Sequence, residues 1–70
     1  MKAIVLKNGH RMAVIQDAQG IVDKPYSVSF WYDGYPDFQW KRGSGGVACD
    51  LCDTVAQAKR KARYYLKKEI

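Results

Sequence analysis

The sequence predicts a small α+β fold: an antiparallel β-sheet of three to five strands, built from two hairpins, with one carboxyl-terminal amphipathic helix packed on one face. The hairpins are predicted by β-rich runs on either side of turn residues, within residues 2–17 and 26–42. The helix is predicted from residue 54 onward, where apolar residues recur at helical spacing after a capping signal. A chain of 70 residues is expected to form one small domain, residues 1–70, with a correspondingly small core.

The first predicted hairpin joins residues 2–7 to residues 10–17 through Asn8-Gly9, the preferred dipeptide of a two-residue type I′ turn. This turn would pair Lys7 with His10. One face would then carry Val5, Met12 and Val14, and the other Ile4, Leu6, Ala13 and Ile15. Because one helix covers only one face of a sheet, the second apolar face would be closed by a partner chain or a loop, or would stay exposed.

The second predicted hairpin contains seven of the nine aromatic residues and turns at residues 33–37, Asp-Gly-Tyr-Pro-Asp. A three-residue loop there would place Phe30 opposite Trp40 and Val28 opposite Arg42 on the core face. The other face would carry Ser27, Ser29, Trp31, Gln39 and Lys41, and is expected to be wet, with Trp31 as its apolar exception.

Two connections complete the sheet. Residues 18–25 contain a glycine and a proline and are expected to link the hairpins, with Ile21-Val22 as a short extension of an edge strand. Residues 42–46 form a glycine-rich loop, and residues 47–49 are expected to be either a brief last strand or the approach to the helix.

The helix is expected to begin after Thr54, because Thr54 and Gln57 have the spacing of a capping box, and to end near Glu69. At about 100° per residue, one stripe is apolar and the other side is basic, with Lys59 at the border. The apolar stripe consists of Val55, Ala58, Ala62, Tyr65 and Leu66, and the basic side of Arg60, Lys61, Arg63, Tyr64, Lys67 and Lys68.

The net charge of +5 is concentrated in this helix. Residues 1–53 hold six basic and six acidic residues, whereas residues 54–70 hold six basic and one acidic residue. Like charges at helical spacing repel one another, so a purely structural face would normally include acidic residues. The pattern therefore favours an anion-binding surface over a plain solvated one.

The two cysteines, in the run Cys49-Asp50-Leu51-Cys52, are the most motif-like feature of the chain. The main interpretation is structural, with at least one thiol buried. A metal shared between two chains and a redox pair are the alternatives, but a zinc site needs four ligands and the redox fold alternates strands and helices. We therefore expect no metal and no cofactor.

No enzymatic activity is expected from the sequence. His10 is the sole histidine and lies beside a turn glycine, and Asp33 and Asp37 flank a turn, where carboxylates usually cap the backbone. The glycine-rich loop lacks the Gly-Lys-Ser/Thr ending of a phosphate-binding loop.

The layout of β-rich runs followed by a helix opening with Asp53-Thr54-Val55-Ala56-Gln57-Ala58 is similar to the three-stranded-sheet DNA-binding domains of plant ethylene-response factors and tyrosine-recombinase amino termini. In those domains the sheet enters the major groove through arginines and tryptophans. Here the sheet is nearly neutral and the cations lie on the helix, so the resemblance covers the layout alone.

The function predicted from these observations is nucleic-acid binding, DNA or RNA, through phosphate contacts from the helix. The residues expected to take part are Arg60, Lys61, Arg63, Tyr64, Lys67 and Lys68 of the helix, Lys41 and Arg42 of the second hairpin, and Trp31 as a stacking platform. The alternative is a protein-interaction module, an inhibitor, an adaptor or a homodimer, that uses the apolar sheet face.

The amino-terminal apolar run of four residues is too short for a signal peptide or a membrane span. We expect a cytoplasmic protein with no membrane association, of a length that would suit a phage or plasmid accessory protein.

Overall fold

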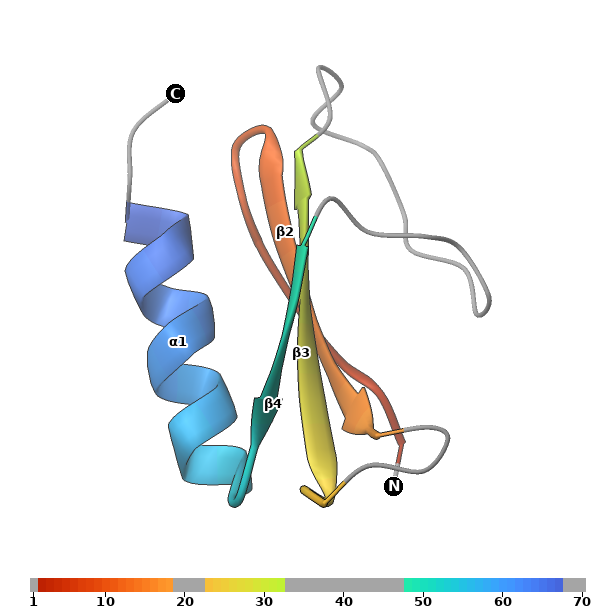
Figure 1. The fold of residues 1–70 in the computed structure, drawn as a ribbon. Coiled ribbons are helices and arrows are strands. Elements are labelled where there is room, and N and C mark those ends of the chain that lie inside the picture. Colours follow the sequence, from red (N-terminus) through yellow and green to blue (C-terminus); the bar gives the residue numbers. More distant parts are fainter. Residues whose placement is uncertain (1, 19–22, 33–47, 68–70) are drawn as a thin grey trace.

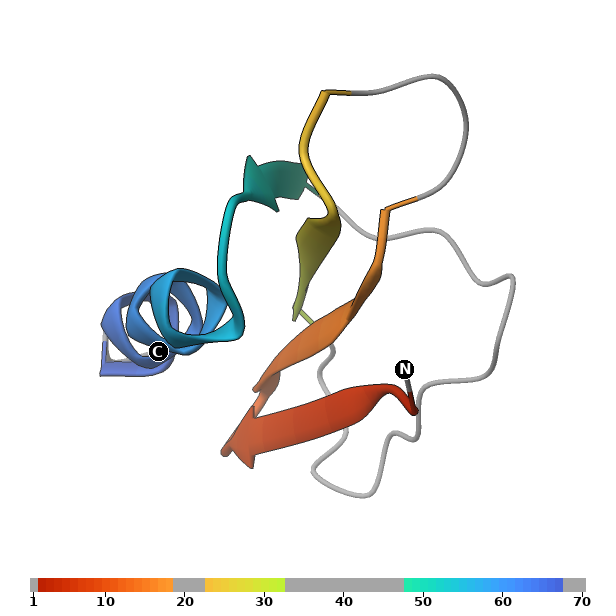
Figure 2. The ribbon, with the colours of Figure 1, turned by 90° about the horizontal axis from the view of Figure 1, so that it is seen from below.

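The computed structural model describes residues 2–18, 23–32 and 48–67. Within these residues, strands β1 (Ile4–Asn8), β2 (Arg11–Asp17), β3 (Tyr26–Tyr32) and β4 (Ala48–Cys52) precede helix α1 (Val55–Lys67). The strands form one antiparallel sheet in the order β1-β2-β3-β4, and α1 lies along one face of it (Figures 1 and 2). The predicted α+β fold is therefore confirmed.

The first hairpin forms as predicted, but its turn lies one residue further along. Asn8 pairs with Arg11, so Gly9 and His10 are the two turn residues, and Lys7 pairs with Met12 instead of His10. Gly9 has φ +60°, and no non-glycine residue in the described part has a positive φ. This pattern matches a type II′ turn, which places glycine first, and not the expected type I′ turn.

The shift in pairing leaves the predicted faces of the first hairpin unchanged. In the observed register Ile4 is opposite Ile15 and Val5 is opposite Val14. Relative to the expected register, each residue of β1 meets a partner two positions further along β2, and two positions is one full side-chain repeat of a strand. The even-numbered residues of β1 therefore still point to the same side as Ala13 and Ile15.

The predicted partner of β3 was wrong. Val28 lies between Ile15 and Asp50, and Phe30 lies between Ala13 and Ala48. Both edges of β3 are thus occupied by β2 and β4, so Phe30 does not pair with Trp40 and Val28 does not pair with Arg42. For residues 47–49 the sequence left open a brief last strand or the approach to the helix. Residues 48 and 49 belong to β4, a strand that continues to residue 52.

Several expectations fall outside the described residues. These are the edge extension at Ile21-Val22, the turn at 33–37, the strand at 38–42 and the glycine-rich loop at 42–46. The ends of the first connection are joined by a hydrogen bond of 2.9 Å from the Ala18 amide to the Pro25 carbonyl.

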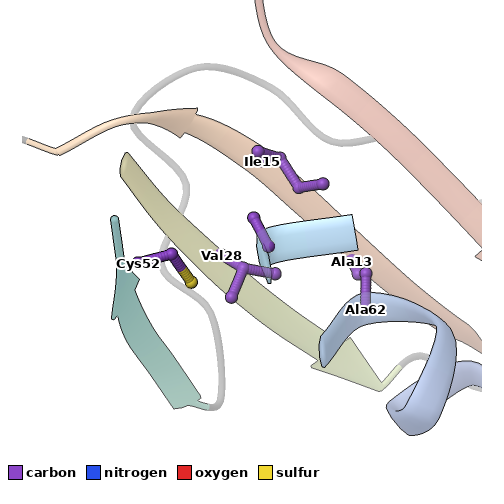
Figure 3. Close-up of a cluster of buried hydrophobic side chains, with 6 residues drawn as sticks. Ala13, Ile15, Val28, Cys52 and Ala62 are labelled. Atoms are coloured by element: carbon purple, nitrogen blue, oxygen red, sulfur yellow. The ribbon is translucent and has the colours of Figure 1, made fainter. Parts of the chain in front are cut away.

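The main core lies between α1 and the sheet. Figure 3 shows Ala13 and Ile15 of β2, Val28 of β3, Cys52 of β4 and Ala62 of α1 converging there, and with Ala58 they are 0–1% exposed. Ile4, Leu6, Tyr26 and Phe30 pack at the margin of this cluster. Because alanine is the helix residue at the centre, the helix backbone can approach the sheet closely.

A second cluster occupies the opposite face of the sheet. Met12, Val14 and Trp31 are 2%, 0% and 8% exposed, and Ala3 packs against them. Ser27 is also buried, at 8% exposed. The face predicted to be wet is therefore shielded at its centre, and the expected solvent exposure of Trp31 is not found.

Candidate functional site

The start of α1 is fixed by the predicted capping pair. The Gln57 amide donates to Thr54 Oγ1 at 3.1 Å, and the Asp53 amide donates to Gln57 Oε1 at 2.9 Å. The Ala58 amide donates to the Thr54 carbonyl at 3.1 Å, which closes the first helical turn. The cap is Thr54, and the side chain of Gln57 bonds to the residue before it, one position earlier than in the standard capping box. Together these bonds satisfy amides that a helix start leaves without a partner.

The end of α1 is held by the first hairpin. The Asn8 side-chain amide donates to the Leu66 carbonyl, and Arg11 Nη1 donates to the Tyr65 carbonyl at 2.9 Å. The Arg11 guanidinium also lies over the Tyr65 ring, 4.8 Å from its centroid. These donors satisfy carbonyls that a helix end leaves open, and the guanidinium opposes the negative end of the helix dipole.

Tyr65 ties the same turn to β3. Its hydroxyl donates to the Trp31 carbonyl at 2.8 Å, and its ring is tilted against Phe30 with centroids 4.9 Å apart. With both ends and one side of the helix fixed, its outer face is presented at a defined orientation.

The two sides of α1 agree with the sequence expectation. Ala58 and Ala62 are buried, Tyr65 and Leu66 are half-buried, and Lys59 at the border is also half-buried. The outer side of the helix is exposed, and Tyr64 is 67% exposed. The exposed residues of this side include Arg60, Lys61, Arg63, Tyr64 and Lys67. Lys68, together with Lys41 and Arg42, lies outside the described residues.

A basic hollow of about 480 Å³ runs along this outer side. It is lined by Ala56, Lys59, Arg60, Arg63, Tyr64 and Lys67. Within the described residues, none of its four cations forms an ion pair with a carboxylate. From Lys59 to Lys67 the helix rises about 12 Å, at 1.5 Å per residue, so the positive charge forms a row and not a point.

A second, open groove of about 440 Å³ adjoins the hollow, between α1 and the sheet. It is lined by Phe30 of β3, Asp50 of β4 and Arg60, Lys61, Tyr64 and Tyr65 of α1. Lys61 Nζ lies 3.9 Å from Asp50 Oδ2 in a half-exposed ion pair. In this pair the charge of Lys61 is partly offset, which separates it from the cations of the basic hollow.

Trp31 is not part of this surface. Its neighbours Val28 and Phe30 face α1 or its margin, whereas Trp31 packs with Met12 and Val14 on the opposite side of the sheet. Trp31 is thus a packed tryptophan and not an exposed stacking platform. Within the described strands, Val5 is the large aliphatic residue that remains exposed, at 42%.

Sequence reasoning did not identify the groove residues Phe30, Asp50 and Tyr65 as neighbours of the basic face. The alternation along β4 holds the signal, since Asp50 and Cys52 point to the same side. This alternation places Asp50 near α1 only if β4 is known to pair with β3.

One of the two cysteines is buried, as expected. Cys52 is 1% exposed in the main core, Cys49 is exposed on the other side of β4, and both are free thiols. No group of three or more histidine, cysteine, aspartate or glutamate side chains that could hold a metal is found among the described residues.

Together these features define a small α+β fold in which α1 packs its alanine side on an antiparallel sheet and presents its basic side to solvent. No family model, curated protein or solved structure matches the chain. Within the described residues, no helix is both long enough and apolar enough to cross a membrane.

Proposed function

We propose that this protein is a small nucleic-acid-binding domain that contacts phosphates through the outer face of α1. The observation that carries the proposal is the basic hollow, in which four cations, Lys59, Arg60, Arg63 and Lys67, surround the exposed Tyr64. Within the described residues, none of the four cations forms an ion pair with a carboxylate. Lysine and arginine side chains in a row are the usual partners of a phosphate backbone.

The dimensions of the row suit a polyanion better than a single small anion. Phosphates recur about every 3.4 Å along the axis of one strand of duplex DNA, so a row of about 12 Å spans three or four of them. The helix backbone that carries these cations is anchored at both ends, by Thr54 and Gln57 at its start and by Asn8 and Arg11 at its end. Lys41, Arg42 and Lys68 are further candidates for the same polyanion.

The cytoplasm is the compartment that we propose for this activity. Two free thiols, one exposed and one buried, are compatible with a reducing environment.

A salt titration tests the proposal. If all four cations of the hollow contact phosphates, the logarithm of affinity should fall with the logarithm of salt concentration with a slope of about −3.6 for duplex and about −2.8 for single strands. Between 50 and 200 mM salt this corresponds to a loss of about 150-fold or about 50-fold, respectively. Fluorescence anisotropy with labelled DNA and RNA of mixed sequence measures both.

The variants are chosen to separate the hollow from net charge. Arg63→Gln should reduce the size of the slope by about 0.7 to 0.9, whereas Lys2→Gln, an exposed cation that does not line the hollow, should leave it nearly unchanged. The combined Arg60→Glu, Arg63→Glu and Lys67→Glu variant should lose binding. Unchanged affinity in that combined variant, with its helical content intact, would refute the proposal.

A further inference from the structure

The groove beside the basic hollow differs from it in chemistry. Among the described residues that line it, Phe30, Tyr64 and Tyr65 are aromatic and Asp50 supplies a carboxylate. Phe30 and Tyr65 pack against each other at 4.9 Å, and Tyr64 is 67% exposed. The groove therefore combines a packed aromatic pair with an accessible ring, which is a surface suited to a flat apolar group.

The groove and the hollow adjoin each other. Arg60 and Tyr64 line both, so one ligand can occupy the two at once. In the groove Asp50 partly offsets the charge of Lys61, whereas the four cations of the hollow have no carboxylate partner among the described residues, so a phosphate is attracted more strongly to the hollow. A ligand that has anionic groups on one side and flat rings on the other matches this division.

We propose that the ligand is single-stranded nucleic acid, whose phosphates lie over the basic hollow while one unpaired base enters the groove and stacks on Tyr64. This inference rests on the proposed function and names its substrate class. In a duplex the faces of the bases are covered by their neighbours, and only an unpaired base offers a free face to an aromatic side chain. The groove volume of about 440 Å³ is within the range of small-molecule sites.

Contacts near the carboxyl end of α1 hold the backbone of Tyr64 in position for this role. Tyr65, the next residue, is fixed by its hydroxyl bond to the Trp31 carbonyl and by the Arg11 guanidinium over its ring. Tyr64 projects from the same helical turn, so its backbone is held while its ring stays accessible. A platform on a fixed backbone loses little conformational entropy on binding.

The test compares four labelled ligands of about 12 nucleotides, a length within the range that one small single-strand-binding fold covers. They are oligothymidine, oligouridine, an abasic DNA strand with the same number of phosphates, and a duplex. Oligothymidine and oligouridine distinguish DNA from RNA as the source of the strand. We expect the wild-type protein to bind at least one of these two strands more tightly than either the duplex or the abasic strand.

Tyr64→Ala should weaken binding of the preferred strand by about 5- to 150-fold, the range for loss of one base-stacking ring. Tyr64→Phe keeps the ring and should stay within about 3-fold of wild type, which separates stacking from a hydroxyl contact. Binding of the abasic strand should be nearly the same in all three proteins. Circular dichroism checks that each variant is folded.

The two proposals fail differently. Equal binding of abasic and normal strands, or tighter binding of the duplex, with a steep salt dependence, would overturn the single-strand inference and leave phosphate binding by α1 intact. Absence of salt-dependent binding to all four ligands would overturn both.

Discussion

Replacement of Arg11 tests how the helix is held on the sheet. In Arg11→Met the aliphatic stem remains, but the bond to the Tyr65 carbonyl and the contact with the Tyr65 ring are lost. A hydrogen bond from a charged donor contributes about 1.5–3 kcal/mol, a cation over a ring at least about 0.5 kcal/mol, and a cation at a helix end about 0.3–1 kcal/mol.

These contributions share one side chain and do not add fully. Arg11 Nε is also buried without a hydrogen-bond partner, and its removal relieves part of the cost of burying the guanidinium. We therefore expect a net loss of about 2 kcal/mol in the free energy of unfolding, which for a chain of 70 residues lowers Tm by about 8–16 °C.

Thermal and urea unfolding followed by circular dichroism measure this loss. Arg11→Lys keeps the charge at the helix end but not the planar group over the ring, so its stability should fall between the wild type and Arg11→Met. Lys2→Met removes an exposed cation and should change stability by less than about 0.5 kcal/mol. If Arg11→Met also stays within about 0.5 kcal/mol of wild type, the guanidinium does not hold the helix end and the reasoning is wrong.

Three further predictions concern the core and the caps. Thr54→Ala removes the acceptor of the Gln57 amide and should lower the urea midpoint by an amount equivalent to about 1 kcal/mol, with a near-wild-type result contradicting a role as cap. Ile15 is fully buried beneath α1, so the free energy of unfolding should fall by about 0.5–1.5 kcal/mol in Ile15→Val and by about 2–5 kcal/mol in Ile15→Ala. Similar losses in the two variants would show that the site is not tightly packed. Alkylation with iodoacetamide should add one label, at Cys49, to the native protein and a second only after denaturation, whereas labelling of Cys52 in the native state would contradict its burial.

The elements and their faces were largely predictable because they depend on local patterns. The hairpin at Gly9, the cap at Thr54 and the division of α1 into an alanine-centred stripe and a basic side follow from turn chemistry and residue spacing. The expected faces of the first hairpin also remained correct despite the error in register, since the two registers differ by a whole side-chain repeat.

The partner of β3 could not be predicted in the same way. A strong turn signal at 33–37 favoured the nearest β-rich run, 38–42, whereas β3 pairs with the more distant β4. The choice between two partners depends on which one completes the core, and Cys52 supplies a buried side chain beside Val28 that the local pattern did not reveal. Trp31 was misjudged for a related reason, because strand alternation assigns a side chain to a face but does not show what shields that face.

The position of the first turn was also settled by tertiary contacts. Asn8-Gly9 is favourable for a type I′ turn, but with Gly9 and His10 in the turn Asn8 becomes the last paired residue of β1. Its side chain then reaches the Leu66 carbonyl while Arg11, its partner across the strands, reaches Tyr65. These two contacts to the end of α1 favour the observed register over the one that local turn preference predicts.

The bonds from the first hairpin to the end of α1 join residues that are 54 and 58 positions apart in the chain. In a nascent chain whose strands pair before α1 has emerged, the apolar side of the sheet, formed by Ala13, Ile15 and Val28, would have no cover. Folding must then close a large loop before these contacts form, which favours a slow and late docking step. The nascent sheet is accordingly the stage at which this protein is most exposed to aggregation and to capture by chaperones.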